Sequence, residues 1–544
     1  MKHYALGLDY GTLSVRALLL DLQTGAEAAT AEYVYPHGIM TQCLPDGTPL
    51  PEGFALEHPV DFIAGLEAVI AGVLEKGQVD GSQVAGIGLD VTSPTVLPVD
   101  AQGMPLCCKP EFASHPHAWM KLWKHHGAEE ISRRLLEVAR RRKERWLTEG
   151  GGILGSEWFI CKATELAVND PEVFANTYSF LEAADWLVWQ LTGNHVRSFT
   201  IAGCTGSYLE SRGYPSKAFF RAAYPQAQSV PDKLQGTFLR LGQTAGGLLP
   251  EMAKRLGLRP QTPVGIGTLD SHAGVIGCGA SKVAEAVIVV GTSGCTMVNA
   301  NYIGGIPGIF GAAQDANIPG LYGYEGSQNC VGDMLSWYVE NCVPYSYYLA
   351  AQQEKKTIHQ YLMEKAEKLQ PGQSGVVALD WFNGVRTPYM DTSLTATISG
   401  LTIRTKPEEI YRALLEAAAF GQRRILELLM QGGCPVERII AGGGIPGKNP
   451  LMMQIYADVC KRPIRLSVSK NASALGSAIL GACAAGQSHT GCKRIPELMD
   501  KYIRSSDTVY LPDPDRGRIY DALYAQYLRL ADQTAAHRER DSYG

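Results

Sequence analysis

The chain has 544 residues, more than one hydrophobic core usually supports, so we expect two domains. Its 45% of hydrophobic and 19% of charged residues are typical of a globular protein. The net charge of −5 gives no electrostatic basis for binding nucleic acid, and no such partner is expected.

The apolar residues are spread along the chain in short runs. No run approaches the roughly 18 consecutive apolar residues of a membrane span, and the first residues lack the apolar region of a signal peptide. The 13 cysteines are an odd number without any CxxC pair, which favours free thiols over a disulfide framework or a zinc site. We therefore expect a cytoplasmic protein without a membrane partner.

The first predicted structure is a set of three strands at residues 4–8, 14–21 and 26–34. The first turn runs from Asp9 to Thr12 and contains Gly11, which lets backbone amides approach an anion closely. Hydroxyl groups there can donate to phosphate oxygens, and Asp9 can hold Mg²⁺ directly or through water. An ordinary Gly-Thr turn would show the same residues. The phosphate-binding candidates are Gly11, Thr12, Ser14 and Arg16.

A helix is predicted at residues 59–76, followed by an apolar strand at 84–90 that ends in Asp90-Val91-Thr92-Ser93. Ligands of open α/β sheets collect at the carboxyl ends of strands, so this tetrapeptide is a candidate site. A simple Asx or N-cap turn explains it equally well.

The segment from His115 to His126 predicts the start of a helix that carries Trp119 and Trp123 on one face. Such a pair of tryptophans belongs more often to a core than to a binding surface. The histidines have no carboxylate or thiol at ligand spacing, so no metal site is expected. The basic residues between 133 and 145 predict a solvated helix face.

An apolar strand at 263–269 ends in Asp270, and small residues after it open a helix. The helix N-terminus favours the anionic form of this carboxylate, which suits a general base acting on a hydroxyl. Helix capping is an alternative role for Asp270, and the two roles are compatible.

The pattern of the first hairpin returns at residues 286–297, where Gly291 and Thr292 begin the turn. Two glycine-hydroxyl turns about 280 residues apart indicate two halves that are built alike and hold phosphates between their tips. Further on, Glu325 lies between two glycines. It is positioned either to present a carboxylate to a polyol or to form a surface turn.

Residues 442–448 nearly match the P-loop pattern GxxxxGK[ST], but Asn449 replaces the hydroxyl residue that would bind Mg²⁺. We interpret Gly443, Gly444 and Asn449 as a turn against which a nucleotide base or ribose can lie. A long helix at 407–430, a helix at 451–461 and a helix of small residues beginning at Ser473 complete this half.

The order of these motifs resembles the FGGY carbohydrate kinases of the actin-like ATPase superfamily, over about residues 4–485. Within that family, several segments look like members that phosphorylate ribulose. These are residues 110–112, 117–119, 121–126, 156–158, 379–384 and 406–417.

The resemblance implies an α/β fold of two RNase H-like (actin/hexokinase/Hsp70-like) domains around a central cleft. Residues 1–280 would bind the sugar, residues 281–490 the nucleotide, and residues 491–544 would form a helical tail. Asp270 would be the catalytic base and Asp9 would bind Mg²⁺ through water. Thr12 and Thr292 would lie near the phosphates of ATP, and Gly443 and Asn449 near the adenosine. The sugar contacts would be Ser93, Trp123, Asp270 and Glu325.

The activity implied by the resemblance is transfer of a phosphoryl group from ATP to the terminal hydroxyl of a ketopentose. L-Ribulose, converted to L-ribulose 5-phosphate in arabinose catabolism, is the first expectation. The family resemblance leaves open another ketose or polyol, such as xylulose. The alternatives without sugar chemistry are a nucleotide-gated sugar sensor and an actin-like ATPase. The expected partners are the small-molecule sugar and a second copy of the chain in a homodimer.

One segment departs from the pattern of the ribulose-phosphorylating members. They carry Ala-Gly-Tyr-Lys where this chain has Ala202-Gly203-Cys204-Thr205. At the substrate position, Thr205 supplies one short hydroxyl where a lysine would supply a charge and three donors. An unpaired substrate group costs about 1–3 kcal/mol, so this residue bears on which sugar is bound.

Overall fold

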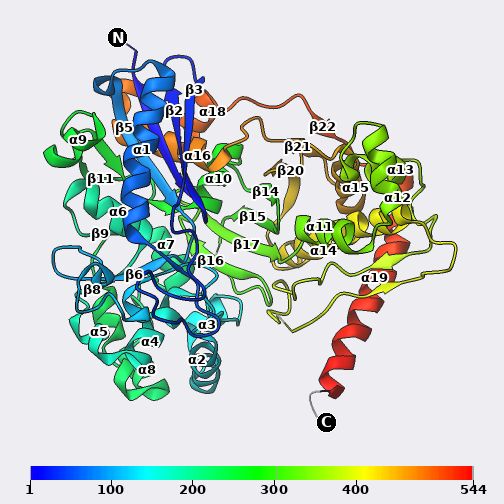
Figure 1. Ribbon diagram of the computed structural model, residues 1–544, viewed down its shortest axis with the longest axis horizontal. Coiled ribbons are helices and arrows are strands. Elements are labelled where there is room, and N and C mark those ends of the chain that lie inside the picture. Colours follow the sequence, from blue (N-terminus) through cyan, green and yellow to red (C-terminus); the bar gives the residue numbers. More distant parts are fainter. Residues whose placement is uncertain (1, 303, 392, 542–544) are drawn as a thin grey trace.

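The computed structural model describes residues 2–302, 304–391 and 393–541, which form two lobes (Figure 1). Each lobe is built around one mixed, mainly buried β-sheet with helices against it. No helix in the described part of the chain is both long and apolar enough to cross a membrane.

The sheet of the first lobe has the order β11-β12-β5-β1-β2-β3. Its strands are β1 (Tyr4–Tyr10), β2 (Ser14–Asp21), β3 (Glu27–Val34), β5 (Val84–Val91), β11 (Thr244–Gly247) and β12 (Pro263–Gly265), and β13 (Thr268–Leu269) pairs with β5. Strand β1 is antiparallel to β2 and parallel to β5. The predicted strands are confirmed, and α1 (Pro59–Gly77) begins and ends close to the predicted bounds.

The second lobe repeats this arrangement. Its sheet has the order β16-β17-β15-β14-β20-β21-β22, and β14 is antiparallel to β15 and parallel to β20. The strands are β14 (Ala284–Val290), β15 (Gly294–Ala300), β16 (Phe310–Gln314), β17 (Tyr322–Gln328), β20 (Val436–Gly442), β21 (Ile464–Leu466) and β22 (Val509–Tyr510). The two halves are therefore built alike, as the repeated hairpin predicts.

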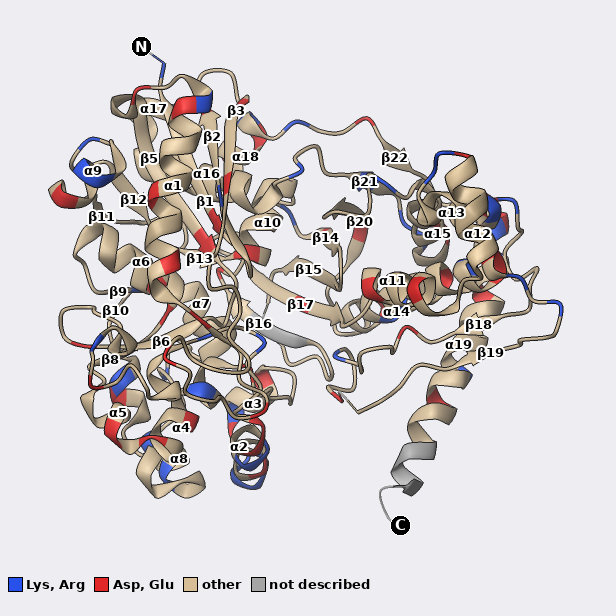
Figure 2. Cartoon of the chain, in the orientation of Figure 1, with Lys and Arg blue, Asp and Glu red and all other residues tan. Residues whose placement is uncertain are grey.

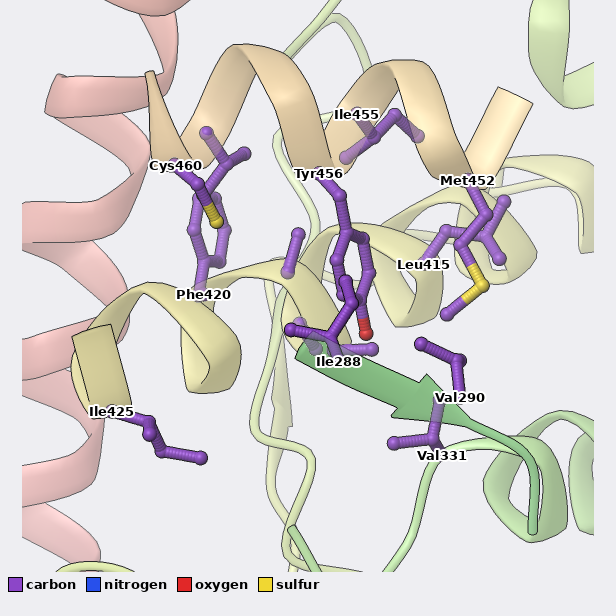
Figure 3. Close-up of a cluster of buried hydrophobic side chains, with 14 of the residues drawn as sticks. Ile288, Val290, Val331, Leu415, Phe420, Ile425, Met452, Ile455, Tyr456 and Cys460 are labelled. Carbon is purple, nitrogen blue, oxygen red and sulfur yellow. The ribbon is translucent and has the colours of Figure 1, made fainter. Parts of the chain in front are cut away.

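The core of the second lobe lies between its sheet and the helices α14 (Pro407–Gln431) and α15 (Pro450–Cys460). Figure 3 shows Ile288 of β14, Phe420 of α14 and Tyr456 of α15 meeting in this core. Both helices carry a proline in the first turn, where no intrahelical N–H is needed. The two predicted helices are confirmed.

A smaller unit extends from the first lobe. It contains a four-stranded sheet of β4 (Leu56–Glu57), β7 (Met120–Lys121), β6 (Val96–Val99) and β8 (Ser179–Glu182), in that order. Helices α2 (Glu129–Arg142), α4 (Phe159–Asn169) and α8 (Lys217–Ala223) contribute to its core. The basic residues of α2 lie along its outer side (Figure 2), in accord with the predicted solvated face.

The prediction of a helix from His115 is wrong. Only a short 3₁₀ turn forms at Pro116–Ala118, after which β7 begins, and α2 begins at Glu129. Strand pairing prevails here because Lys121 is buried in β7, with its Nζ 2.6 Å from Glu165 Oε2. Trp119 is buried, as the core interpretation expects.

The remaining helices and strands complete these units or link them. In the first lobe they are α3 (Arg145–Glu149), α5 (Pro171–Asn176), α6 (Ala183–Thr192), β9 (Val196–Ser198), α7 (Phe199–Gly206), β10 (Thr237–Leu239), α9 (Pro250–Leu256) and α10 (Asp270–Cys278). In the second half of the chain they are α11 (Gly332–Cys342), α12 (Tyr345–Gln353), α13 (Ile358–Glu367), β18 (Val377–Ala378), β19 (Ile398–Ser399), α16 (Ala472–Ala485), α17 (Gln487–Thr490), α18 (Ile495–Tyr502) and α19 (Pro514–Asp541).

The chain changes lobes several times. It leaves the first lobe at residues 279–283 and returns at 467–471, so that α16 and α18 pack against the first lobe. It crosses again at 503–508, after which β22 and α19 join the second lobe (Figure 1). The C-terminal tail is helical, and its helices are divided between the two lobes.

Helix α16 packs very closely because glycines face it on both sides. A Cβ on Gly7 of β1 would lie 2.1 Å from the carbonyl oxygen of Ala474, and one on Gly88 of β5 would lie 2.1 Å from that of Ser477. On the other side, a Cβ on Gly277 of α10 would lie 1.8 Å from the carbonyl oxygen of Ala472. Helix α16 thus fixes α10 relative to the sheet.

We expect Gly277→Ala to destabilise the protein by about 3 kcal/mol or more, because the added methyl overlaps backbone that has no room to move. Thermal or urea unfolding measures the change. Gly274→Ala on the same helix is the matched control. Outside the backbone of α10, the atom nearest to its added Cβ would be Ser473 Oγ at 3.5 Å, an ordinary contact distance. This control is expected to be neutral or stabilising by up to about 1 kcal/mol. Equal stability of the two variants would contradict the close packing.

Candidate functional site

Three carboxylates meet at the carboxyl ends of neighbouring strands in the first lobe. Asp9 of β1 and Asp90 of β5 are register partners, and both are buried. Asp270 begins α10 directly after β13, whose Thr268 pairs with Asp90. The parallel arrangement of these strands therefore brings acidic residues that are 81 and 180 positions apart in sequence to one edge of the sheet.

Burial and mutual repulsion raise the pKa of these groups. Burial raises the pKa of Asp9, against the opposing effect of Arg16. Burial and the charge of Asp9 raise the pKa of Asp90 well above its usual value, although Ser477 Oγ donates to Asp90 Oδ2 at 2.5 Å. Sequence reasoning places Asp90 in a candidate turn but misses its proximity to Asp9.

The pKa of Asp270 is raised to about 7 by burial and by the charge of Asp9. The backbone amide of Ser271 donates to Asp270 Oδ1 at 2.7 Å and opposes this rise. A carboxyl group with a pKa near neutrality is half ionised at physiological pH and is a stronger base than an ordinary aspartate. The arrangement therefore suits proton removal from a hydroxyl.

The residues around Asp9 fit a bound Mg²⁺. The cation paired with Asp9 among the described residues is Arg16, whose Nη1 lies 3.8 Å from Asp9 Oδ2, so the negative charge of Asp9 is incompletely compensated. Among the described residues, no group of three or more acidic, histidine or cysteine side chains is placed to hold a metal ion. Mg²⁺ typically takes one or two carboxylates and completes its shell with phosphates and water.

A cavity of about 220 Å³ lies next to Asp270 and contains the predicted sugar contacts. Trp123 Nε1 donates to Thr12 Oγ1 at 3.0 Å, so the first hairpin touches the wall of this cavity. The remaining predicted contacts in its lining are Ser93, Thr205, Asp270 and Glu325. The structure thus brings together every residue predicted for the sugar.

A buried polar layer behind this cavity was not predicted. Glu182 Oε1 accepts from the Thr205 hydroxyl at 2.7 Å, and Glu182 Oε2 accepts from the Ser93 hydroxyl at 3.2 Å. Burial raises the pKa of Glu182 to about 8. Lys162 donates to the carbonyl oxygens of Pro94 (2.6 Å) and Leu122 (2.7 Å), and burial lowers its pKa to about 7. These residues hold the sugar contacts in place but belong to no sequence motif.

In each hairpin turn, the amide of the glycine donates to a backbone carbonyl two or three residues further along the chain. The amide of Gly11 donates to the carbonyl of Ser14, and that of Gly291 donates to the carbonyl of Ser293, each at 2.9 Å. The hydroxyl of Ser14 donates to Glu32 Oε1 at 2.8 Å, and Arg16 is paired with Asp9 and Glu32. The side chains of Ser14 and Arg16 are thus engaged within the sheet.

A cavity of about 860 Å³ in the second lobe contains four of the five nucleotide contacts predicted in that lobe. Gly291, Thr292, Gly444 and Asn449 line it. Asn449 also caps α15, because its Oδ1 accepts from the amide of Met452 at 3.0 Å. Gly443 is not in this lining. It adopts a positive φ of 100°, and a Cβ there would lie 2.5 Å from the carbonyl oxygen of Val290.

Several polar residues that line this second cavity were missed by sequence reasoning. They come from α11, α13 and the segment before α13, which carry no recognisable nucleotide motif. These residues are Asp333, Ser336, Thr357, His359 and Gln360.

The same two-lobed fold occurs in solved sugar and glycerol kinases. A xylulose kinase from Rhodospirillum rubrum superposes with a TM-score of 0.80 at 23% identity, covering 98% of this chain and 99% of that one. A Plasmodium falciparum glycerol kinase with ADP gives a TM-score of 0.75 at 19% identity, covering 97% and 98%. At this level of identity the likeness shows the fold.

Family models decide the relationship. The model of the FGGY carbohydrate kinase N-terminal domain matches residues 4–277, and that of the C-terminal domain matches residues 286–485. The chain belongs to the FGGY family of carbohydrate kinases. It is accordingly an ATP-dependent carbohydrate kinase, and the resemblance that its motifs predict is confirmed.

Curated FGGY relatives match this kinase over nearly its full length. A ribulokinase from Geobacillus thermodenitrificans is 43% identical over 533 residues, covering 98% of this chain and 94% of the relative. A ribulokinase from Mycolicibacterium smegmatis is 38% identical over 533 residues, covering 97% and 93%.

Proposed function

We propose that this FGGY kinase phosphorylates the terminal hydroxyl of a ketopentose, with L-ribulose as the substrate and L-ribulose 5-phosphate as the product. The observation that carries the proposal is the position of Asp270, which lines the sugar cavity beside the phosphate hairpin of Asp9. The relatives named ribulokinase, which match almost the whole chain, support this choice of sugar.

In the proposed mechanism, Asp270 orients the terminal hydroxyl and accepts its proton as the oxygen attacks the γ-phosphorus of ATP. The amides and hydroxyls at the two hairpin turns, Thr12 and Thr292 among them, stabilise the charge that develops on the phosphoryl group. Asp9 is the proposed Mg²⁺ residue, and the bound ion would neutralise phosphate charge. Closure of the lobes would exclude water and limit hydrolysis of ATP.

A different ketose or a polyol is the second candidate substrate, because Thr205 offers a hydroxyl where a lysine is expected. Xylulose belongs to this group. A sugar sensor or an actin-like ATPase has less support, since neither requires a carboxylate with a pKa near 7 in a sugar-sized cavity.

Release of ADP in the presence of Mg²⁺ and a panel of ketopentoses, ketohexoses and polyols tests the proposal. We expect the highest kcat/KM with L-ribulose and a product phosphorylated at the terminal carbon. Faster turnover of xylulose or of a polyol would reassign the substrate. Sugar-independent release of ADP at the same rate would refute the kinase proposal.

A further inference from the structure

The sugar cavity has one cationic side chain among the described residues that line it. This is Arg386, which lies in the second lobe between β18 and β19. The sugar contacts that were predicted in the first lobe are neutral or acidic. The expected substrate-binding lysine is replaced by Thr205, so the positive charge enters the cavity from the opposite side of the cleft.

Most polar groups of this cavity are arranged to accept hydrogen bonds from the substrate. The carboxylates of Asp270 and Glu325 have no donor when ionised. The hydroxyl protons of Ser93 and Thr205 are directed to Glu182. These four groups suit substrate hydroxyls, which can donate.

The N–H groups of Trp123 and His272, which also line the cavity, are weaker donors than a charged group would be. Trp123 Nε1 is already bonded to Thr12. The imidazole of His272 is buried, with Nε2 4.0 Å from Cys204 Sγ, and burial lowers its pKa to about 4. It is therefore neutral at physiological pH, and hydrogen bonds from charged donors are about twice as strong as those from neutral ones.

The guanidinium of Arg386 lies between acidic groups of both lobes. Its Nη2 is 3.3 Å from Oε1 of Glu157, which lies in the first lobe and also lines the cavity. Burial raises the pKa of Glu325 in β17, while Cys295 and the charge of Arg386 oppose that rise. The distance between Arg386 Nη2 and Glu157 Oε1 is long for a charge-assisted hydrogen bond, which is usually about 2.7–2.9 Å.

We propose that Arg386 is a specificity-determining residue of this site and donates a hydrogen bond to the keto oxygen of a ketose substrate. The inference rests on the proposed sugar-kinase function and deepens it, because it assigns recognition of the carbonyl to the second lobe. A ketose then bridges the two lobes when it binds, whereas a pentitol of the same length lacks the carbonyl and gains less from Arg386.

The test compares L-ribulose with its reduced form, ribitol, in wild type and in Arg386→Gln. The KM for L-ribulose and the inhibition constant of ribitol as a competitor are measured at saturating ATP. We expect Arg386→Gln to raise the KM for L-ribulose by about tenfold or more, as for loss of a hydrogen bond from a charged donor, and the inhibition constant of ribitol by less than about threefold. Unchanged ATP affinity by calorimetry shows that the variant is folded.

Two further variants separate substrate recognition from lobe pairing. Glu157→Gln removes the charge of the carboxylate that contacts Arg386 and is expected to change the ratio of the two constants less than Arg386→Gln does. Arg424→Gln removes an arginine of α14 outside the sugar cavity and is expected to change neither constant. Arg386→Lys keeps the charge and is expected to recover part of the lost L-ribulose affinity.

An equal rise in both constants for Arg386→Gln, or no rise in either, would overturn the assignment of Arg386. The assignment is likewise overturned if Glu157→Gln changes the ratio of the KM for L-ribulose to the inhibition constant of ribitol as strongly as Arg386→Gln does. A wild-type protein that phosphorylates no sugar would instead refute the proposed function, so the two failures are distinguishable.

Discussion

Replacement of Asp270 by Asn is expected to lower kcat by about two to four orders of magnitude, the usual contribution of a general base, with little change in the KM for the sugar. The amide keeps the shape of the side chain but cannot accept the proton of the attacking hydroxyl. Steady-state kinetics with L-ribulose measures the loss. A variant that retains activity within about tenfold of wild type would show that Asp270 is not the base.

The pH dependence of the wild type provides an independent check on the same group. Because the pKa of Asp270 is about 7, we expect kcat/KM to rise with pH and to level off above pH 7. In Asp270→Asn this dependence should disappear from the residual activity. A wild-type profile that is already flat from pH 5 upward would mean that the base titrates like an ordinary aspartate.

The same pKa shift has a consequence for stability. The folded-state pKa lies above the value of 3.8 for the unfolded chain, so the native state binds this proton more tightly. The contribution of Asp270 to stability is therefore present below about pH 4 and is lost as the pH rises to about 7. Asp270→Asn should remove this penalty, and its advantage in unfolding free energy over wild type should grow across that pH range in the absence of nucleotide.

The second large effect is expected for Asp9→Asn, which should lower kcat by about a hundredfold or more, because a bound metal supplies several kcal/mol of charge stabilisation. Its thermal stability should be equal to or higher than that of wild type, because burial disfavours the ionised form of Asp9 and raises its pKa. The titration of Asp270 should also move to lower pH, since the charge of Asp9 contributes to its raised pKa. Kinetics over a range of Mg²⁺ concentrations and thermal unfolding measure these changes.

Asp61→Asn is a suitable control for this variant. Asp61 is a buried aspartate of the same lobe that accepts from the backbone amide and the imidazole of His37, away from the sugar cavity. Its replacement should lower stability and leave kcat within about twofold. Retention of wild-type activity by Asp9→Asn at low Mg²⁺ would refute the role of Asp9.

The parts of the site that could be predicted from sequence are those whose chemistry lies in adjacent residues. The two hairpin turns and the strand that ends in Asp270 combine a recognisable local structure with the functional group itself. Glu182 and Lys162 could not be found in this way, because they act through contacts 23 to 89 residues away in sequence. The polar residues of α13 in the nucleotide cavity likewise become significant only once the helix is placed.

The errors in the fold have the same origin. The pair Trp119 and Trp123 has helical spacing, but burial of Lys121 beside Glu165 favours a strand. The small residues of α16 allow the close packing that the structure shows. The sheet against which α16 packs, however, belongs to the other lobe. The ligand-binding and catalytic roles of all the predicted site residues, the assignment of sugar and nucleotide to the two domains, the Mg²⁺ ion, the homodimer and the cytoplasmic location stay predictions.

The three crossings of the chain at residues 279–283, 467–471 and 503–508 determine how the lobes can move. We expect three connections between the same two bodies to limit sliding and separation, so that the lobes open mainly by rotation about these short linkers. Displacement in a rotation increases with distance from its axis. Groups at the rim of the cleft farthest from these linkers therefore move most. A small bend of the linkers then opens the cleft for the sugar to enter and leave.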